Sequence, residues 1–571
     1  MKYSWDKYLD PYRGEFFEDD WPTISQIFQI TVKKFPNRRC FTKFAPERFS
    51  LTYKEVYQYV INVSSYLREK GLVKGDKVVL NGKNSIEWAI AYLSVNFAGG
   101  VVVPLDNQLT IKKVKQLSLY SDCKFFLADK NILEALDKYD DSVLSSLTHC
   151  MTLQGKSTQY PAMMAAKAKV QMNPEKGNEE DIAAILFTSG TTGNEKGVVL
   201  TQKNITSDIY QAKDEQFLQL DETDILYALL PLHHSYCCTA VLLVSVAFGS
   251  ECVFGHGIVV SRMVNDLTHG EVTVFMGIPL LYNKLLAGMM REVKKKGFVT
   301  NTLVHTLMLI NGFFKVHFHK NPFRKFFDKK LLSKVGFAHN RILICGAGPL
   351  SPKVFKQYQQ LGLDFIQGYG LTETSPILTL NPISKFKLES VGKLFELVEA
   401  KIINKDSNGV GEIVVKGPNI CKGYYKDEEN TRKLFDKDGW LLTGDLGYID
   451  SERYVYLKGR AKNIIVTEGG KNVFPEEIED LFQLHSQVDQ ILVRGYQEKK
   501  DVPAECIEAV IYPSEEYFKD KKDQIDIEMK EVINSVNKEL SGYKKIGKVT
   551  IVNEPMVMTS TKKIKRNLVA N

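Results

Sequence analysis

A run of small and hydroxylated residues between two apolar stretches is the first place in this sequence that could do chemistry. It reads Leu-Phe-Thr-Ser-Gly-Thr-Thr-Gly-Asn-Glu-Lys-Gly-Val-Val-Leu over residues 186–200. Its glycines let backbone N–H groups approach an anion, its hydroxyls donate hydrogen bonds without charge, and Lys196 supplies a cation. The P-loop NTPase pattern is not met, since Glu195 stands where a glycine is needed and Gly197 where a hydroxyl is needed. The composition favours a phosphate-binding loop over a simple surface turn.

Four later segments complete a series of motifs. They are GYGLTE at 368–373, LTGD at 442–445, GRAKNII at 459–465 continuing to GGKNVFPEEIE at 469–479, and TSTKKIKR at 559–566. With the loop T-S-G-T-T-G-x-x-K-G, and in this order, they resemble the signatures of the adenylate-forming superfamily of acyl-CoA synthetases, luciferases and peptide-synthetase adenylation domains. The form of the motifs is most similar to long-chain fatty acid CoA ligases. The resemblance extends from residue 188 to residue 566 and so covers essentially the whole chain.

The resemblance implies a nucleotide site and a reaction. A carboxylate would attack the α-phosphorus of ATP, release pyrophosphate and leave an acyl adenylate. Thr372 would contact the α-phosphate, Glu373 would be the Mg²⁺ ligand, and Lys563 would bridge the carboxylate and the α-phosphate. The residues implied to bind ATP or AMP are Thr188, Ser189, Gly190, Thr191, Thr192, Lys196, Gly346, Ala347, Gly348, Tyr369, Asp445 and Arg460. Among them, Tyr369 would stack on adenine, the segment 346–348 would form the neighbouring wall, and Asp445 with Arg460 would bond the ribose hydroxyls.

The resemblance also implies a second half-reaction, in which a pantetheine thiol attacks the adenylate. The family's C-terminal lid rotates about a hinge residue so that the catalytic lysine leaves the site. Lys462 occupies the hinge position here, and Gly469 and Gly470 would lie near the thiol tunnel. CoA is the expected acceptor, which makes ATP, Mg²⁺ and CoA the implied cofactors and co-substrates.

Two positions depart from the family pattern. Glu195 replaces the proline usual before the loop lysine, and Lys562 replaces the glycine usual before the C-terminal lysine. Lys563 rather than Lys562 is assigned as catalytic, because it stands two residues before Lys565 and three before Arg566. We expect both departures to be tolerated.

The segment Pro-Leu-His-His-Ser-Tyr at 231–236 resembles the family element that lines the acyl pocket. His234, with His233 and Tyr236, should border the carboxylate end of the substrate. Paired histidines can also bind metal, but neighbours in sequence seldom point the same way and no acid or cysteine ligand set stands near in the sequence. No aspartate is found at an equivalent of the amino-acid anchor of peptide-synthetase domains, so a fatty acid is the preferred substrate.

Short apolar runs alternate with longer amphipathic stretches through the first two thirds of the chain, as in KVVLNG followed by IEWAIAYLSVNFAGG. This pattern predicts an α/β fold with mostly parallel sheets. The predicted large N-terminal domain, 1–461, has α/β subdomains at about 1–180 and 181–370 and a small β-rich subdomain at 371–461. Residues 462–571 are predicted to form a mobile α+β lid. The uncharged run 225–250 is divided by Pro231, the histidine pair and Gly249 into a short strand-like run, a polar turn and about ten apolar residues, so we do not expect a membrane span there.

Composition excludes other classes of protein. The chain has 571 residues, 44% hydrophobic and 25% charged, with a net charge of +7, which is too weak for nucleic-acid binding. Nine scattered cysteines and an acidic, aromatic N-terminus predict a cytoplasmic protein without a disulfide framework. Residues 291–341 hold twelve Lys or Arg against two acids, a local charge of +10. Aromatics alternate with these cations, so the segment is either a solvated helical insertion or a peripheral contact with the anionic inner face of a membrane.

The expected activity is therefore ATP-dependent conversion of a long-chain fatty acid to an acyl adenylate and then to acyl-CoA. Two alternatives stay open. The acceptor could be the phosphopantetheine of acyl carrier protein, or the chain could be a lipid-binding relative that has lost turnover. The intact Lys196, Glu373, Asp445, Arg460 and Lys563 count against the second alternative.

Overall fold

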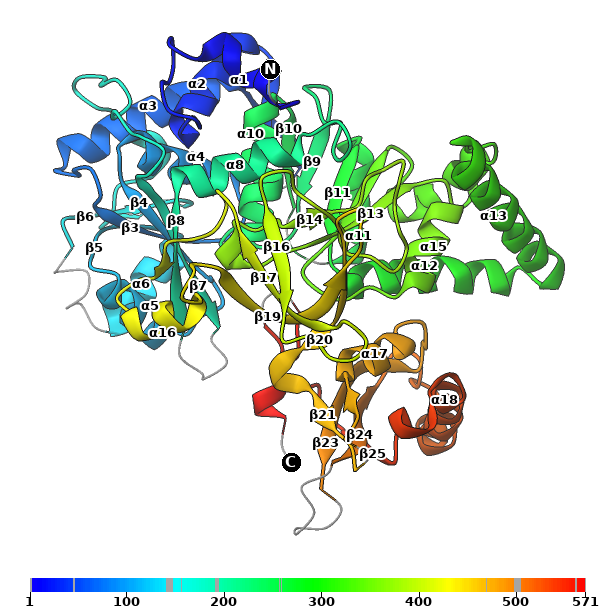
Figure 1. Cartoon of the computed structure of the whole chain (residues 1–571). Coiled ribbons are helices and arrows are strands. Elements are labelled where there is room, and N and C mark those ends of the chain that lie inside the picture. Colours follow the sequence, from blue (N-terminus) through cyan, green and yellow to red (C-terminus); the bar gives the residue numbers. More distant parts are fainter. Residues whose placement is uncertain are drawn as a thin grey trace.

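The computed structural model places a large domain above a small one, joined near residue 461 (Figure 1). The structure describes residues 3–44, 47–139, 147–155, 157–189, 195–255, 257, 259–468, 470–497, 505–559 and 562–569. Two sheets, of seven and thirteen strands, form the large domain, and a three-stranded sheet forms most of the small one. The α/β class expected from the alternating pattern is confirmed.

The seven-stranded sheet has the order β18-β8-β7-β4-β3-β5-β6. Its strands are β3 (Lys77–Asn81), β4 (Val101–Leu105), β5 (Cys123–Ala128), β6 (His149–Thr152), β7 (Ile182–Ser189), β8 (Glu195–Thr201) and β18 (Gly423–Tyr424). The five strands from β6 to β7 run parallel, whereas β8 and β18 are antiparallel additions. The apolar runs of β3, β4 and β5 are buried, as expected of parallel strands covered on both faces.

The thirteen-stranded sheet joins distant parts of the chain in the order β16-β17-β19-β20-β15-β14-β13-β12-β11-β9-β10-β1-β2. Its first six strands in the sequence are β1 (Arg39–Lys43), β2 (Phe49–Thr52), β9 (Ile225–Ala228), β10 (Glu251–Phe254), β11 (Val274–Gly277) and β12 (Ile342–Cys345). The others are β13 (Asp364–Tyr369), β14 (Thr379–Leu380), β15 (Gly392–Leu394), β16 (Glu399–Ile403), β17 (Gly411–Lys416), β19 (Leu441–Ile449) and β20 (Tyr454–Arg460). Strands β1 and β9 to β13 are parallel, and from β14 onward the pairing is antiparallel.

The subdomain boundaries expected at residues 180 and 370 do not separate these sheets. Strands β7 and β8 follow residue 180 but pair with β4 of the first sheet, while β1 and β2 near the N-terminus belong to the second. The strands after residue 371 continue the second sheet through the pairing of β13 with β14. Strand pairing over long sequence distances is decided by packing, which local patterns do not report.

Helices cover both sheets. The longest buried one is α4 (Ile86–Phe97), which begins at a cap where Ser85 Oγ accepts from the Trp88 N–H, and it is apolar over nearly its whole surface. The others before residue 270 are α1 (Asp6–Leu9), α2 (Ile24–Lys34), α3 (Tyr53–Glu69), α5 (Ile111–Tyr120), α6 (Lys130–Tyr139), α8 (Gln202–Ala212), α9 (Ser235–Cys237), α10 (Val244–Phe248) and α11 (Val260–His269). After it come α12 (Pro279–Lys295), α13 (Phe298–Phe318), α14 (Arg324–Lys330), α15 (Pro352–Gln360) and α16 (Glu428–Leu434).

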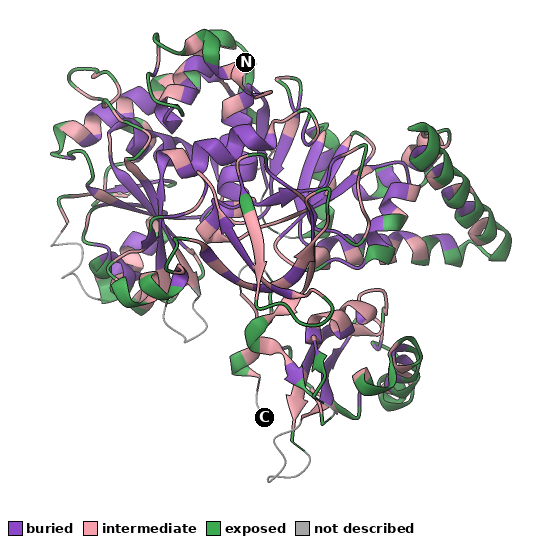
Figure 2. Cartoon of the chain, in the orientation of Figure 1, coloured by how far each residue is buried: buried purple, intermediate pink, exposed green. Residues whose placement is uncertain are grey.

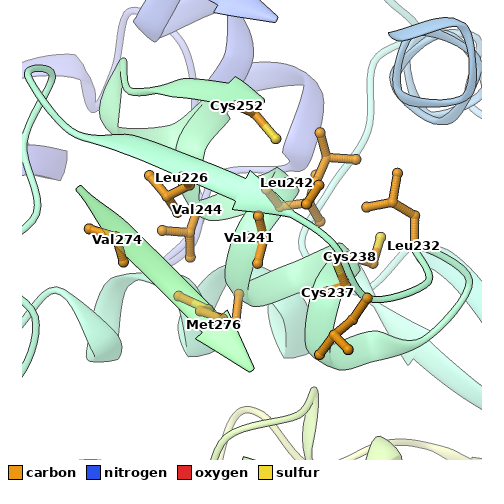
Figure 3. Close-up of a cluster of buried hydrophobic side chains, with 14 of the residues drawn as sticks. Leu226, Leu232, Cys237, Cys238, Val241, Leu242, Val244, Cys252, Val274 and Met276 are labelled. Atoms are coloured by element: carbon orange, nitrogen blue, oxygen red, sulfur yellow. The ribbon is translucent and has the colours of Figure 1, made fainter. Parts of the chain in front are cut away.

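The uncharged run 225–250 folds into strand β9, a polar turn, a π-helix over Cys238–Leu243 and helix α10, which confirms the expected division. Figure 3 shows side chains of this run packing against β9, β10 and β11. Val241, Leu242 and Met276 in that cluster are almost fully buried. Among the described residues, no helix is both long enough and apolar enough to cross a membrane.

The small domain has a three-stranded sheet of β23 (Val488–Tyr496), β24 (Cys506–Pro513) and β25 (Lys548–Ile551), with β24 in the middle. Helices α17 (Pro475–Glu479) and α18 (Ile525–Glu539) pack on it around a separate apolar core that includes Val493, Ile511 and Val532. A hairpin of β21 (Ile465–Val466) and β22 (Asn472–Val473) precedes them. We call residues 462–571 the lid and keep residue 462 as its predicted start.

Candidate active site

Several of the predicted site residues lie just beyond the carboxyl ends of parallel strands. His234 follows β9, the segment 346–348 follows β12, and Thr372 with Glu373 forms a short 3₁₀ turn after β13. In α/β sheets ligands bind at this edge, because the loops there converge and can differ without disturbing the sheet. The fold therefore gathers at one edge residues that are more than 130 positions apart.

Asp445, Tyr369 and Arg460 form a bonded group at the centre of this edge. Asp445 and Arg460 are directly opposite each other on the antiparallel strands β19 and β20, and Arg460 Nε lies 2.6 Å from Asp445 Oδ1. The Tyr369 hydroxyl donates to Asp445 Oδ2 at 2.6 Å. Burial raises the pKa of Asp445, while Arg460 and the Tyr369 hydrogen bond oppose that rise. Both carboxylate oxygens have partners that ribose hydroxyls would have to share or displace.

Glu373 lies on the turn after β13, four residues beyond Tyr369 of this group. Its Oε1 accepts a hydrogen bond of 2.8 Å from the Tyr424 hydroxyl, and its backbone carbonyl accepts from the Cys421 N–H. The preceding Gly370 has no space for a side chain, since a Cβ there would lie 1.8 Å from the Pro376 carbonyl oxygen. Glycine at that position lets the turn carrying Thr372 and Glu373 fold back tightly. The carboxylate is hard and oxygen-based, so Glu373 fits a Mg²⁺ ion held jointly with nucleotide phosphates.

Lys196 faces the same region from β8. Its Nζ donates to Asn430 Oδ1 at 2.9 Å and lies 4.7 Å from the centre of the Tyr424 ring. Asn430 and Tyr424 lie next to Lys196 because β18 pairs with β8 in antiparallel register, with Tyr424 opposite Val198. Lys196 and Glu373 therefore share Tyr424 as a neighbour, which brings the predicted phosphate cation and the predicted metal ligand together.

The phosphate loop itself is described only at its two ends. Thr188 and Ser189 end strand β7 and pair with Lys196 and Glu195 of β8. The predicted positions Gly190, Thr191 and Thr192 lie outside the described residues. Glu195, where the family has proline, forms an ion pair with Lys113 of α5, so its charge is balanced beside the loop.

The segment Gly346-Ala347-Gly348 forms the neighbouring wall. Ala347 has a φ of 65°, in the left-handed region, so the chain turns sharply after β12. A Cβ at Gly346 would lie 3.1 Å from the Tyr236 ring, and one at Gly348 would lie 3.4 Å from Pro279. The Tyr236 hydroxyl donates to the carbonyls of Gly277 and Ile344, both at 3.3 Å, which seats the predicted acyl-pocket tyrosine against the predicted adenine wall.

His233 and His234 lie side by side, with ring centres 4.2 Å apart. His233 Nε2 is 3.5 Å from Asp106 Oδ2 on the first sheet. Burial, with the neighbouring His233, lowers the pKa of His234 to about 3, so this ring is neutral at physiological pH. The described residues contain no group of three or more His, Cys, Asp or Glu side chains arranged to hold a metal.

Lys563 reaches this site from the lid. Thr559 and Lys563 close a tight turn through two hydrogen bonds, Thr559 N–H to the Lys563 carbonyl at 2.8 Å and Lys563 N–H to Thr559 Oγ1 at 3.1 Å. Lys562 within the turn has a φ of 62°, the conformation that glycine favours, which explains why the family usually has glycine there. Lys563 is exposed to solvent, yet the surrounding atoms partly desolvate its ammonium and, with the nearby charge of Arg460, lower its pKa to about 8.

The sequence matches the AMP-binding enzyme family over residues 28–425 and the C-terminal domain of AMP-binding enzymes over residues 462–571. The chain belongs to the AMP-binding enzyme family. It is 26% identical to the chloroplastic long-chain-fatty-acid--[acyl-carrier-protein] ligase AEE15 of Arabidopsis thaliana, over 96% of this chain and 85% of that relative. It is 27% identical to the long-chain-fatty-acid--CoA ligase ACSBG1 of Mus musculus, over 81% of this chain and 67% of that one.

Solved structures agree in fold. The ATP-bound MatB of Rhodopseudomonas palustris superimposes with a TM-score of 0.73 at 24% identity, covering 96% of this chain and 98% of that one. The superfamily and fold expected from the motifs are thus confirmed for this AMP-binding enzyme.

The hinge and tunnel positions lie on the lid side of the site. Lys462 follows β20 directly, and burial together with Arg460 and Arg566 lowers its pKa. Gly470 forms the exposed turn of the β21–β22 hairpin with open space around its Cα, while Gly469 lies outside the described residues. The place of Gly470 near a thiol tunnel stays a prediction.

Several residues of the candidate site were not predicted from the sequence. Tyr424 and Asn430 contact Lys196 across more than 220 positions, through the short strand β18. Asn84 fixes the histidine segment by donating to the carbonyls of Ala228 and Leu230 and accepting from the Leu232 N–H. No motif spacing indicates these residues, because each acts through a contact between parts of the chain that are far apart in the sequence.

Proposed function

We propose that this AMP-binding enzyme activates a long-chain fatty acid with ATP and transfers the acyl group to the thiol of CoA. The observation that supports the proposal is that Lys563 of the lid lies close enough to Arg460, Asp445 and His234 of the large domain for its charge to interact with theirs. A cation at that point faces both the proposed ribose site and the proposed acyl-pocket wall.

The chain's own groups supply the electrostatics of the first step. Lys196 would neutralise the outer phosphates, and Lys563 would draw the acyl carboxylate and the α-phosphate together as the new P–O bond forms and the bond to pyrophosphate breaks. Glu373 would hold Mg²⁺, which supplies charge neutralisation on the phosphates when bound. The uncharged ring of His234 would border the acyl carboxylate and would not compete with Lys563 for it.

The fatty acid and the acceptor are proposals drawn from relatives. AEE15 is named as a ligase for acyl carrier protein and ACSBG1 as a ligase for CoA, and both names include long-chain fatty acids. CoA is our first choice, and acyl carrier protein is the second candidate because the AEE15 match covers nearly the whole chain.

Pyrophosphate release from ATP and Mg²⁺ tests the proposal, with fatty acids from acetate to stearate and with CoA, acyl carrier protein or neither. We expect a maximum at long chain lengths that requires CoA. Turnover only with acyl carrier protein would move the function to the second candidate. ATP binding without turnover on any acid would overturn the enzymatic proposal and favour a lipid-binding relative.

A further inference from the structure

Helix α13 projects from the large domain and exposes an apolar surface (Figure 1). Figure 2 shows it exposed along most of its length. Of the 23 large hydrophobic side chains exposed among the described residues, nine are on this helix, with exposed fractions from 37% to 84%. They are Phe298, Val299, Leu303, Leu309, Ile310, Phe313, Phe314, Val316 and Phe318. An apolar patch of this extent marks an interaction surface.

The opposite side of α13 is fixed to the body of the protein. Asn311 Nδ2 donates to the Gln360 carbonyl at 3.0 Å, and Lys315 Nζ lies 2.9 Å from Asp364 Oδ1. Val304 and Met308, on the same side, are buried against the core. Residues 304, 308, 311 and 315 are three or four positions apart, so they lie on one face of α13. This face packs against the protein, and the opposite face therefore points away from it.

The outward side has no charge. It follows positions 299, 303, 306, 310, 313 and 317, of which only Thr306 and His317 are polar. Lys315 is the single Lys, Arg, Asp or Glu within the 21 residues of α13, and it is buried on the inward side. The helix is about 30 Å long at 1.5 Å per residue, so the uncharged strip is as long as the helix itself.

Cations stand at both ends of this strip. Lys294 is in the last turn of α12 and Lys296 follows that helix, just before α13. Lys320 follows α13, and Lys325 and Lys329 are on α14 beyond it. All five are exposed, and within the described part of the chain none forms an ion pair. Other cations of the basic segment have internal roles: Arg324 bonds Asp328 and the carbonyls of Gly362 and Asn340.

We propose that α13 lies flat in the interface of an anionic membrane, with its outward apolar side among the acyl chains and the flanking lysines against the headgroups. An uncharged strip bordered by cations matches an anionic bilayer surface in both polarity and charge. A second copy of the chain fits less well, because a paired α13 would bring the lysine clusters of two molecules together. The proposal goes beyond the proposed function, since it assigns a surface and a partner that the reaction does not require.

The position of α12 connects this surface to the active site. The helix begins at Pro279, beside Gly348 of the site wall, and ends at Lys295, next to α13. Its 17 residues span about 25 Å. A membrane-bound α13 would therefore hold the active site within about that distance of the bilayer, from which an acyl substrate could be drawn.

Co-sedimentation of the full chain with vesicles tests the proposal without any substrate. We expect the protein to sediment with vesicles containing phosphatidylglycerol and to stay in solution with pure phosphatidylcholine. The double variant Ile310→Glu/Phe313→Glu should lower the partition coefficient at least about tenfold, and Lys294→Glu/Lys296→Glu should lower it by a similar factor. Both sets of side chains are exposed, so the fold should survive, as circular dichroism can verify.

The control is Ile527→Glu, which places one such charge on an exposed aliphatic residue of lid helix α18 and should sediment like the wild type. A Phe313→Trp variant adds a direct readout, because its fluorescence should shift to the blue with anionic vesicles. Unchanged sedimentation of the Ile310/Phe313 variant would overturn the proposal. A wild-type dimer that this variant converts to monomer, with no vesicle binding, would also overturn it and would assign the surface to a second copy.

Discussion

At the scale of single residues, the site around Asp445 combines three residues of the large domain with one lysine of the lid. Asp445, Tyr369 and Arg460 are joined by short hydrogen bonds within the large domain. Lys563 comes from the lid and is held there by the turn that begins at Thr559. A group that must act in one step and leave before the next is best placed on an element that can move as a unit.

Lys563→Ala should separate the two half-reactions. We expect loss of adenylate formation by at least about a hundredfold, because the variant removes the positive charge that Lys563 would hold at the reacting carboxylate. Formation of thioester from supplied acyl adenylate should fall less than about threefold. Single-turnover assays of each step give the comparison, with Lys562→Ala as the neighbouring control. Equal loss in both steps would argue against a lysine that serves only the first.

The pH dependence of adenylate formation should report the same lysine. Lys563 is cationic below its pKa of about 8 and loses its charge as the pH rises through that value. The value of kcat/KM for ATP should therefore fall above pH 8, while His234, with a pKa of about 3, contributes nothing in that range. Lys563→Arg should move the alkaline limb upward, since a guanidinium stays charged. If the alkaline limb of the pH profile stays in place in Lys563→Arg, the group that titrates is not Lys563.

The sequence predicts these residues to the extent that they belong to short motifs. Asp445 and Arg460 could be named because each stands in its own motif, and the register of β19 and β20 then explains why they meet. Tyr424 and Asn430 could not be named, because their contact with Lys196 depends on a two-residue strand that pairs across the chain. Spacing identifies members of one loop, whereas partners supplied by strand pairing become visible only in the fold.

At the scale of elements, the same limit applies to the sheets. The alternating pattern predicts strands such as β3, β4 and β12 and the helices that follow them, since each pattern is local. It does not predict that β1 and β2 join the second sheet, because their partner β10 lies about 200 residues later. The exposed position of α13 agrees with the helical insertion that was one of the two expectations for the cations of 291–341.

The lid sheet is stabilised by a buried carboxylate on its central strand. Glu508 Oε1 accepts from Lys548 and Thr550 at 2.8 and 2.7 Å, and Oε2 accepts from Arg494 at 2.8 Å. Burial alone would raise the pKa of Glu508, but these hydrogen bonds outweigh it and lower the pKa to about 2. A lowered carboxyl pKa means stability that is present above the ordinary value of 4.5 and is lost as the pH falls toward 2.

Glu508→Gln should therefore destabilise the lid by up to about 3 kcal/mol at pH 7, with a smaller difference at pH 3. Hydrogen exchange of β24 amides in wild type and variant at each pH measures the free energy of opening. The exposed Glu531→Gln on α18 is the control and should change little. A difference that does not shrink on acidification would show that the loss arises from packing rather than from the charge.

At the scale of the whole molecule, the lid is docked on the large domain by a set of polar contacts on α12 and around α15. Gln483 Oε1 accepts from the Ser351 N–H at 2.9 Å and from Asn283 Nδ2 at 3.2 Å, and its Nε2 donates to the Pro349 carbonyl at 3.2 Å. Ion pairs of 2.8 Å join Lys284 to Asp489 and Lys353 to Glu539. None of these residues belongs to the site, yet together they hold the arrangement in which Lys563 reaches Asp445.

These contacts should set the balance between the two half-reactions. Ion pairs at an exposed boundary contribute little singly, but Gln483 satisfies three groups of the large domain at once. Gln483→Ala combined with Lys284→Ala should favour the turned lid and lower the single-turnover rate of adenylate formation about tenfold, which corresponds to about 1.4 kcal/mol. Thioester formation from supplied acyl adenylate should be unchanged or faster, because that step would use the other arrangement of the lid.

A charge exchange distinguishes docking from a general loss of structure. Lys284→Asp alone should slow adenylate formation, and adding Asp489→Lys should restore much of it, since the ion pair is rebuilt with its charges reversed. Gln524→Ala on the exposed start of α18 serves as the neutral control. Slowing of both half-reactions without rescue would mean that α12 affects the catalytic site directly. Rescue confined to adenylate formation would show that these residues set the balance between two lid positions. Lys284 is on α12, ten residues before Lys294, which borders the surface that we assign to the membrane.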